Sequence, residues 1–391
     1  MRRLLDVFLI FLRLGLTSFG GPVAHLGYFR TEFVERRRWL DEAAYADLVA
    51  LCQFLPGPAS SQVGMALGIS RAGLWGALAA WAGFTLPSAA LLVAFAYGVG
   101  QVGDVSDAGW LRGLKIVAVA IVAQAVLGMS RTLTPDRPRV LIALGAAMAA
   151  LLVSSAAAQV GIIVMAGLIG WRFLTMADAP RASALPVTLS RRLGTAFLGA
   201  FVALLVILPV LREVVGGPAL ALVDSFYRAG SLVFGGGHVV LPLLEAEVVP
   251  TGWVTPDAFL AGYGATQAVP GPLFTFSAYL GAVSAVGLPS LLAAGLALGA
   301  IFLPSFLLVA GALPFWHALS AQSVLRGVNA GVVGLLLAAL YSPVFTAGVR
   351  STGEFAFVLG AFAALEYLKW PVWLVVALSA GVGALVWAGG T

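Results

Sequence analysis

Long apolar runs constrain this chain more than any other feature of its sequence. They cover residues 71–100, 110–130, 140–170, 193–211, 286–315, 327–347 and 371–388. A helix needs about 20 apolar residues to cross the hydrocarbon core of a bilayer, so these runs predict membrane-spanning helices. The composition agrees, because 61% of the residues are hydrophobic and only 10% are charged, whereas soluble domains carry about 25% charged residues. We therefore expect an all-α polytopic membrane protein embedded in a lipid bilayer.

The charge, cysteine and histidine content argues against several kinds of ligand and cross-link. The net charge of +5 is expected to lie in cytoplasmic loops rather than to bind nucleic acid, since Lys and Arg accumulate on the cytoplasmic side of membrane proteins. Cys52 is the single cysteine, which excludes an internal disulfide and a cysteine metal site. The three histidines are scattered, so neither a metal nor another cofactor is expected. Asp6 and Arg13 interrupt the first apolar stretch, so we expect no cleavable signal peptide.

Two parts of the chain repeat the same uncommon residues in the same order. LRLGLTSFGGPVAHL at 12–26 has a counterpart in YRAGSLVFGGGHVVLP at 227–242. WLDEAAYADLVALCQFLPGP at 39–58 aligns without a gap to WVTPDAFLAGYGATQAVPGP at 253–272. Matches in Gly, Pro, Arg and Gln are more specific than matches among Leu and Ala, so they indicate a duplicated domain. The expected units are an N-terminal repeat at 1–176, a cytoplasmic linker with one connecting transmembrane helix at 177–217, and a C-terminal repeat at 218–391.

Loop charges predict that the second repeat is inverted relative to the first. A single connecting helix inverts the second half if each half crosses the membrane an even number of times. The segment after the first FGG carries Arg30 and three arginines at 36–38, whereas its counterpart carries Glu245 and Glu247 and no base. The positive-inside rule places the first segment in the cytoplasm and the second outside. Arg350 is the one conflicting charge, and inverted repeats are common among secondary transporters.

Two short motifs in each half are expected to interrupt membrane helices. Pro lacks a backbone donor and Gly permits positive φ, so FGG and PGP should end helices. We expect residues 4–29 to enter the membrane, break at the glycines and return, and 42–55 to form a second hairpin with 59–69. Interrupted backbone at membrane depth is tolerated where it lines a cavity, and a helix N-terminus binds anions. The alternative is a simple kink in which buried Gln53 or Gln267 bonds a freed carbonyl.

Basic residues within the apolar segments add candidates for the same site. An arginine inside the membrane costs at least about 3 kcal/mol and usually faces a cavity or a partner. Arg13 and Arg228 occupy matched positions near the expected midplane, where they would face a substrate or form internal ion pairs. Asp224 lies one turn before Arg228, but no acid has this spacing from Arg13. Lys115 is a further candidate.

The complete candidate site combines the two motifs with their polar and basic neighbours. Ser60 and Ser61 follow the first PGP with hydroxyls and free N–H groups, whereas Thr275 lies in a less polar counterpart. For the matched acids Glu32 and Glu247 we favour structural pairing with arginine, and a proton-carrying role stays open. The substrate-binding candidates are Arg13, Phe19, Gly20, Gly21, Gln53, Pro56, Gly57, Pro58, Ser60, Ser61, Lys115, Arg228, Gly235, Gly236, His238, Gln267, Pro270, Gly271, Pro272 and Thr275.

At these motifs the chain resembles the chromate ion transporter family in its long, two-domain form. The marks of that family are an FGG segment near the start of each half and a PGP segment further on, here at 19–21 with 56–58 and at 234–236 with 270–272. The resemblance implies a multi-pass transporter of the inner membrane that exports chromate, with two oppositely oriented halves. Some members are tied to sulfate handling. His238, which follows the second FGG closely, is a candidate hydrogen-bond donor or pH sensor and has no histidine counterpart in the first half.

The resemblance and the charge of the substrate together set the expected function. Export of a dianion from a negative cytoplasm is favoured by the membrane potential, so export driven by that potential, by a proton gradient or by both would give chromate resistance. Transport of sulfate or a related oxyanion, and an anion channel on the same scaffold, are the alternatives. An intramembrane enzyme is not expected, because no H-E-x-x-H motif or nucleophile–base pair is evident. The sequence leaves a homodimer open.

Overall fold

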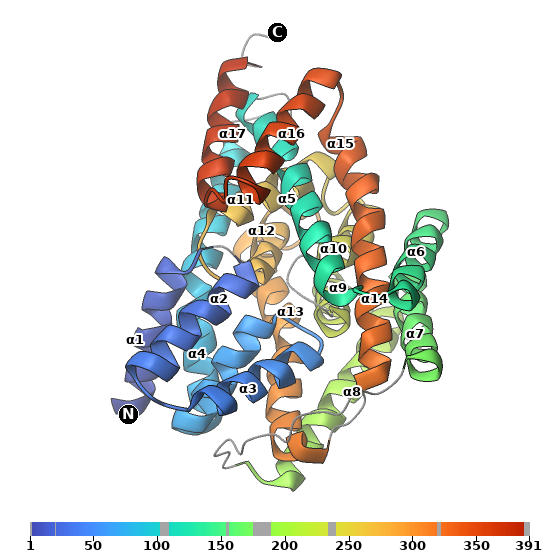
Figure 1. The fold of residues 1–391 in the computed structure, drawn as a ribbon. Coiled ribbons are helices and arrows are strands. Elements are labelled where there is room, and N and C mark those ends of the chain that lie inside the picture. Colours follow the sequence, from blue (N-terminus) through green and yellow to red (C-terminus); the bar gives the residue numbers. More distant parts are fainter. Residues whose placement is uncertain are drawn as a thin grey trace.

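The computed structural model describes residues 2–19, 21–101, 109–153, 156–174, 189–233, 240–318 and 322–386. Within these residues every regular element is a helix, and the helices form an elongated bundle (Figure 1). The described helices that are long and apolar enough to cross a membrane are Ala59–Gly98, Gly109–Leu133, Arg191–Val214 and Ser290–Phe315. The expected all-α polytopic membrane fold is therefore confirmed.

The first half of the chain folds into helices α1 to α7. They are α1 (Arg2–Thr17), α2 (Gly21–Arg30), the π-helix η1 (Thr31–Arg36), α3 (Glu42–Phe54), α4 (Ala59–Gln101), α5 (Gly109–Leu133), α6 (Arg137–Leu152) and α7 (Ala156–Phe173). The side chain of Asp41 caps α3 and that of Asp136 caps α6 by accepting a backbone N–H of the first turn. α4 consists of two helices joined at a kink, because Ala72 and Gly73 have non-helical backbone angles.

The connecting helix comes next in the chain, and the helices of the second half follow it. They are α8 (Arg191–Val214), α9 (Pro218–Leu232), α10 (Val240–Val248), α11 (Pro256–Ala268), the 3-10 helix η3 (Leu273–Thr275), α12 (Phe276–Val283), α13 (Ser290–Ala312), the 3-10 helix η4 (Leu313–Ala318), α14 (Gln322–Ala339), the π-helix η5 (Leu340–Phe345), α15 (Thr346–Gly348), α16 (Thr352–Glu366) and α17 (Val372–Val386). Apolar side chains of α8 such as Val202, Val206 and Val210 are exposed. They would face lipid, as expected of a connecting transmembrane helix.

The first two hairpins are interrupted where the motifs predict. α1 ends at Thr17 and α2 begins at Gly21, and the return of α2 along α1 brings Phe29 to 5.5 Å from Phe11, measured between ring centroids. α3 ends at Phe54, and α4 begins only after PGP at 56–58. The second half repeats the PGP break between α11 and η3, while its FGG segment lies outside the described residues.

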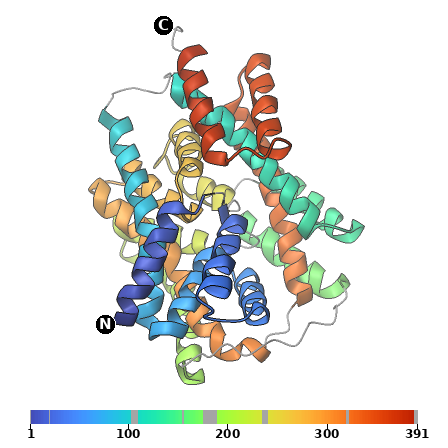
Figure 2. The ribbon, with the colours of Figure 1, turned by 60° about the vertical axis from the view of Figure 1, so that its left-hand side comes forward.

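The two halves of the chain are intertwined. The α6–α7 hairpin of the first half packs against α14 of the second, and the α16–α17 hairpin of the second half packs against α5 of the first (Figures 1 and 2). Glycines allow these contacts, since a Cβ at Gly113 would meet the backbone of α17 and one at Gly327 would meet the backbone of α7. Small residues at helix contacts are the usual basis of close packing in membranes. Neither half buries its helices by packing on itself alone.

Matched contacts also occur within each half. α1 packs against α4, where a Cβ at Gly15 would lie 2.8 Å from the Phe84 carbonyl oxygen. α9 packs in the same way against α13, where a Cβ at Gly230 would collide with the Ile301 carbonyl. Such correspondence is what a duplicated unit predicts. It also means that the interrupted hairpins rest on the long apolar helices of their own half.

Candidate functional site

The PGP segment of each half is hydrogen-bonded to the other half. The Gly57 N–H donates to the Val233 carbonyl at 2.6 Å, and the Gly271 N–H donates to the Ser18 carbonyl at 2.9 Å. Val233 directly precedes the second FGG and Ser18 directly precedes the first, so the two bonds occupy matched positions. His25 lies between the Ser18 carbonyl and the Ser60 hydroxyl, so the two bonds lie in one region, which we call the crossing.

A serine from the opposite half packs against each PGP glycine. Gly57 has φ +123° and Gly271 has φ +98°, a region that residues with a side chain rarely adopt. A Cβ at Gly271 would lie 2.8 Å from the Ser88 hydroxyl oxygen, and one at Gly57 would collide with the Ser305 hydroxyl. Ser88 and Ser305 end the repeated LPS triplets of the two halves. Glycine is thus required at both positions by backbone angle and by space.

The first turn of α4 is the most polar part of the crossing. Ser60, Ser61 and Gln62 are all buried there. Gln62 donates its side-chain amide to the Pro56 carbonyl at 2.6 Å, which is the role that the kink alternative gave to a glutamine before PGP. Gln53 is instead exposed, so it does not play the buried role that the kink alternative gave it, and its contact with a substrate stays a prediction. The physical reason is that α3 turns the Gln53 side chain away, whereas Gln62 lies one turn past PGP, over the freed carbonyl.

Several buried polar atoms around the crossing have no hydrogen-bond partner among the described residues. Ser18 Oγ, Ser61 Oγ, Thr85 Oγ1, Gln267 Nε2 and Ser305 Oγ can donate, whereas Gln62 Oε1 can only accept. Burying a polar group without a partner is costly, and native proteins keep few such groups. Unpartnered donors beside a helix N-terminus are what an anion site requires before its anion binds.

The matching turn in the second half is much less polar. Leu273 and Phe274 stand where the first half has Ala59 and Ser60, and both are buried. Thr275 keeps its hydroxyl bonded to the Pro272 carbonyl at 2.7 Å, so its hydrogen is already used. The sequence predicts that the turn after the second PGP is less polar than the turn after the first, and the structure shows this difference.

Arg13 has an acidic partner that its own helix does not supply. Its guanidinium lies 2.5 Å from the Glu32 carboxylate, which also contacts Arg36 at 2.9 Å and Arg37 at 2.6 Å. The Glu32 side chain is only 4% exposed, while that of Arg13 is 47% exposed. Burial alone would raise the pKa of Glu32, but hydrogen bonds from Arg37 and Arg13 and their charges lower it. Three guanidinium groups around one carboxylate leave this cluster electropositive.

Arg228 forms the matched pair in the second half. It contacts Glu247 at 3.0 Å and Asp224 at 2.9 Å, and Arg212 of α8 adds a contact to Asp224 at 3.2 Å. Two bases and two acids make this cluster neutral, unlike its counterpart. The pairing favoured for Glu32 and Glu247 is the one that the structure contains.

Lys115 is also paired, and its partner comes from the other half. The ammonium of this buried side chain lies 3.0 Å from Asp257 of α11, and Arg350 reaches the same carboxylate at 3.8 Å. The pair ties α5 to the first turn of α11, at the end of that helix away from the PGP segment. Other predicted residues contribute less or lie elsewhere: the Phe19 ring packs near Trp373, with centroids 6.2 Å apart. Gly20, Gly235, Gly236 and His238 lie outside the described residues.

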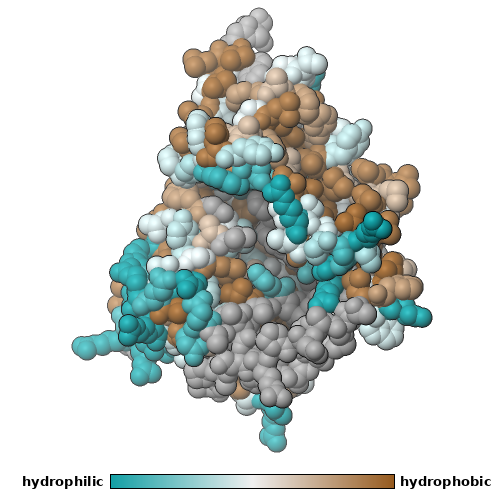
Figure 3. Space-filling view, in the orientation of Figure 1, coloured by the Kyte–Doolittle hydropathy of each residue, from teal (hydrophilic) through white to brown (hydrophobic). Residues whose placement is uncertain are grey.

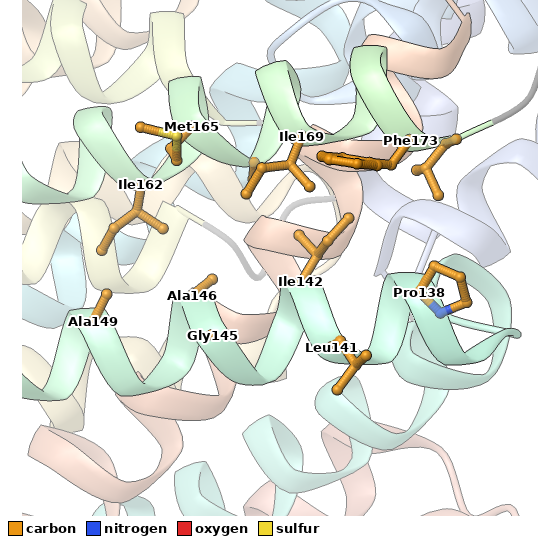
Figure 4. Close-up of a pocket in the computed structure, with 12 residues that line it drawn as sticks. Pro138, Leu141, Ile142, Gly145, Ala146, Ala149, Ile162, Met165, Ile169 and Phe173 are labelled. Atoms are coloured by element: carbon orange, nitrogen blue, oxygen red, sulfur yellow. The ribbon is translucent and has the colours of Figure 1, made fainter.

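One face of the molecule is divided by polarity. Hydrophilic residues border a hollow in the middle of the face shown in Figure 3, and hydrophobic residues cover much of its upper and right-hand parts. A cavity of about 500 Å³ between α6 and α7 is lined by apolar residues such as Ile142, Met165 and Phe173 (Figure 4). This cavity offers no donor for an anion, so the crossing is the better candidate.

Comparison with known proteins identifies the family. The chromate transporter family model matches the chain twice, at residues 5–171 and again at 220–384. The chain belongs to the chromate transporter family. A chromate transport protein of Pseudomonas aeruginosa is 33% identical to it over 85% of this chain and 79% of that protein. A chromate transport protein of Cupriavidus metallidurans is 25% identical over 92% of this chain and 86% of its own length.

A shorter relative of this chromate transporter family member matches only part of the chain. The uncharacterized transporter YwrB of Bacillus subtilis is 30% identical over 168 residues, which are 41% of this chain but 83% of YwrB. A relative of this chain thus exists with about the length of one half. No solved structure matches the chain significantly.

Sequence reasoning missed two residues of the site. His25 is fully buried, with Nδ1 3.3 Å from the Ser60 hydroxyl and Nε2 3.1 Å from the Ser18 carbonyl. Ser305 enters from α13 of the other half. His25 lies close to the first FGG but is not the aligned equivalent of His238, and the repeated LPS triplet is the signal that could have pointed to Ser305.

Proposed function

We propose that this protein is a secondary transporter that exports chromate from the cytoplasm across the inner membrane, and so confers chromate resistance. Family membership and the names of its relatives in Pseudomonas aeruginosa and Cupriavidus metallidurans support chromate as the substrate. The observation that carries the site is the crossing, where each PGP segment bonds the other half and unpartnered hydroxyls surround the first turn of α4.

The proposed site binds a tetrahedral dianion with backbone and hydroxyl donors. A helix start carries about half a positive charge, so the first turn of α4 neutralises part of the dianion. Ser61 and Ser305 add buried hydroxyls that have no partner in the described part of the chain, and Ser60 adds a third that contacts His25. The remaining predicted residues of the two motifs shape the backbone that holds these donors.

Arginine is proposed to act at the approach to the crossing. Arg13 shares Glu32 with Arg36 and Arg37, and this electropositive cluster would attract an oxyanion from the cytoplasm. Arg228 sits in a neutral cluster, which suits release on the other side. Under this proposal Arg13 contacts the anion on entry and returns to Glu32 afterwards.

The membrane potential favours export of a dianion, so a coupling ion is not required for modest gradients. Moving a charge through the membrane potential is worth about 2.3 kcal/mol per 100 mV, and a dianion that leaves a negative interior gains roughly twice that. Two oppositely oriented halves that rock about the crossing would expose it to each side in turn. Matched contacts of α1 with α4 and of α9 with α13 support such a pair of units.

Uptake of radiolabelled chromate into everted vesicles tests the proposal. We expect saturable accumulation in vesicles that contain the protein and only background in empty vesicles. Arg13→Ala should lower this uptake severalfold, while Arg131→Ala, which removes an exposed guanidinium from α5, serves as a matched control. Absence of accumulation in the native protein would contradict chromate export. Stronger competition by sulfate than by unlabelled chromate would favour the alternative oxyanion, and flux that does not saturate would favour a channel.

A further inference from the structure

His25 lies between the polar first turn of α4 and the Ser18 carbonyl, which is bonded to the other half. It lies on α2 and its ring has a different neighbour on each side. The Ser18 carbonyl accepts from its Nε2 and also from the Gly271 N–H, so both lone pairs of that oxygen are used. Because a carbonyl can only accept, the proton of the neutral imidazole must be on Nε2. Nδ1 is then an acceptor, and the Ser60 hydroxyl must donate its hydrogen to it.

We infer that the first turn of α4 binds the oxyanion together with one proton, which is held on Nδ1 of His25. The inference rests on the proposed function and names the residue that couples protons to it. When Nδ1 takes up a proton from water, it becomes a donor to Ser60 Oγ. The Ser60 hydroxyl hydrogen is thereby released and turns to the anion. One proton therefore adds a positive charge and converts Ser60 into an anion donor in a single step.

Within the described residues, the surroundings of His25 offer no negative charge, so binding of this proton should depend on binding of the anion. The neighbours that contact its ring include the Ser18 carbonyl, the Ser60 hydroxyl and the Phe84 ring, which packs edge-on at 5.2 Å. None of them is charged, and no ion pair involves His25 in the described part of the chain. Tyr45 of α3 is a titratable neighbour, but its hydroxyl donates to the Leu26 carbonyl. A buried imidazolium without a counter-ion is costly, so the anion and the proton should bind together.

Two further hydroxyls point to an anion at this turn, and the second half lacks the residues that hold the proton. The hydroxyls of Ser61, on the turn itself, and of Ser305, which packs against Gly57 just before it, are unpartnered and at most 2% exposed. At the matched positions of the second half, His25 and Ser60 are replaced by Val240 and Phe274. The proton-linked site is therefore one-sided, although the backbone that frames it is repeated.

Proton uptake on anion binding tests the inference. The purified full chain is placed in lipid nanodiscs in weakly buffered alkaline solution with a pH-sensitive dye, and chromate is added while bound tracer is counted. The native protein should take up about one proton per bound anion, by the reciprocity of linked binding. His25→Gln can still donate to Ser18 and accept from Ser60 but cannot be protonated, so it should bind chromate more weakly and take up none. His317→Gln, on η4, is the matched histidine control and should behave as the native protein does.

The outcomes separate the inference from the proposed function. Chromate binding by the native protein without proton uptake, or equal uptake by His25→Gln, would overturn the role of His25 and leave chromate transport standing. No chromate binding by the native protein would contradict the proposed function itself. The titration of free chromate is common to all proteins and cancels in the comparison. If His25→Gln does not fold, His25→Asn is the second non-titrating variant. Native affinity that tightens by about tenfold per unit fall in pH is a further expected result.

Discussion

Single buried charges in this protein are held by partners from other segments, and Glu32 is the clearest case. Its carboxylate accepts from Arg13, Arg36 and Arg37 while its side chain is almost fully buried. A buried acid surrounded by three bases is stabilised in its charged form. Removing that acid would leave three guanidinium groups repelling one another at the approach to the crossing.

Glu32→Gln should therefore lower the stability of the protein at neutral pH by about 1–2 kcal/mol, because the guanidinium groups are partly exposed and water screens them. The folded-state pKa of Glu32 is lowered, so its pairing stabilises the fold above the unfolded-state pKa and is lost as pH falls through the folded-state pKa. The variant should thus lose part of the native acid sensitivity. Thermal unfolding in detergent across a pH series measures both effects.

Glu35→Gln is the matched control for that measurement. Glu35 lies in the same π-helix and pairs with Arg30, but both side chains are largely exposed. Its removal should change the unfolding temperature little. An equal fall in the unfolding temperature of both variants would mean that the ion pairs of Glu32 stabilise the protein no more than an exposed pair does.

At the scale of elements, the PGP segments decide how the interrupted helices meet. Pro and Gly end α3 and α11, but the same residues also present a backbone N–H to the opposite half. The glycines are fixed by positive φ and by a serine that fills the space of a side chain. Each loop therefore works as a contact between halves as well as a helix break.

Gly57→Ala and Gly271→Ala should each destabilise the protein by about 1–3 kcal/mol through backbone strain alone, with the collision against serine adding to it. Chromate uptake should fall in parallel, because the loop can no longer reach the other half. Thermal unfolding and vesicle uptake are the measurements. Gly128→Ala in α5 is the control, since nothing lies within 4 Å of its added Cβ. Native uptake in either PGP variant would show that the crossing is not part of the transport path.

At the scale of the whole molecule, the halves exchange their C-terminal hairpins around α5 and α14. Closely packed glycines at Gly113 and Gly327 make this exchange tight. If the halves move relative to each other, as the proposed transport requires, the contacts of both exchanged hairpins must change.

The proposed opposite orientation of the halves gives a labelling prediction. In a Cys52→Ala background, which removes the single buried cysteine, Glu35→Cys and Thr251→Cys place thiols at exposed positions of the matched loops. A maleimide that cannot cross membranes should label position 35 only in everted vesicles and position 251 only in right-side-out vesicles. Labelling of both positions from the same side would contradict inverted repeats.

Much of this protein could be predicted because its strongest signals are local. Apolar runs of membrane length, helix breaks at Pro and Gly, and the polar turn after the first PGP depend on residues close together in the chain. The unequal polarity of Ser60 and Phe274 could be read directly from aligned positions. The repeat itself is visible for the same reason, since glycine and proline tolerate few replacements.

What tertiary structure alone decided is which distant groups meet. Nothing in the spacing of Arg13 indicates Glu32, nothing in Lys115 indicates Asp257, and the contact of Ser305 with Gly57 joins the two halves. His25 becomes interesting only once Ser18 and Ser60 are placed on either side of its ring. Sequence patterns report the conformation and polarity of neighbours along the chain, whereas these partners are set by the packing of helices whose close approach depends on shape.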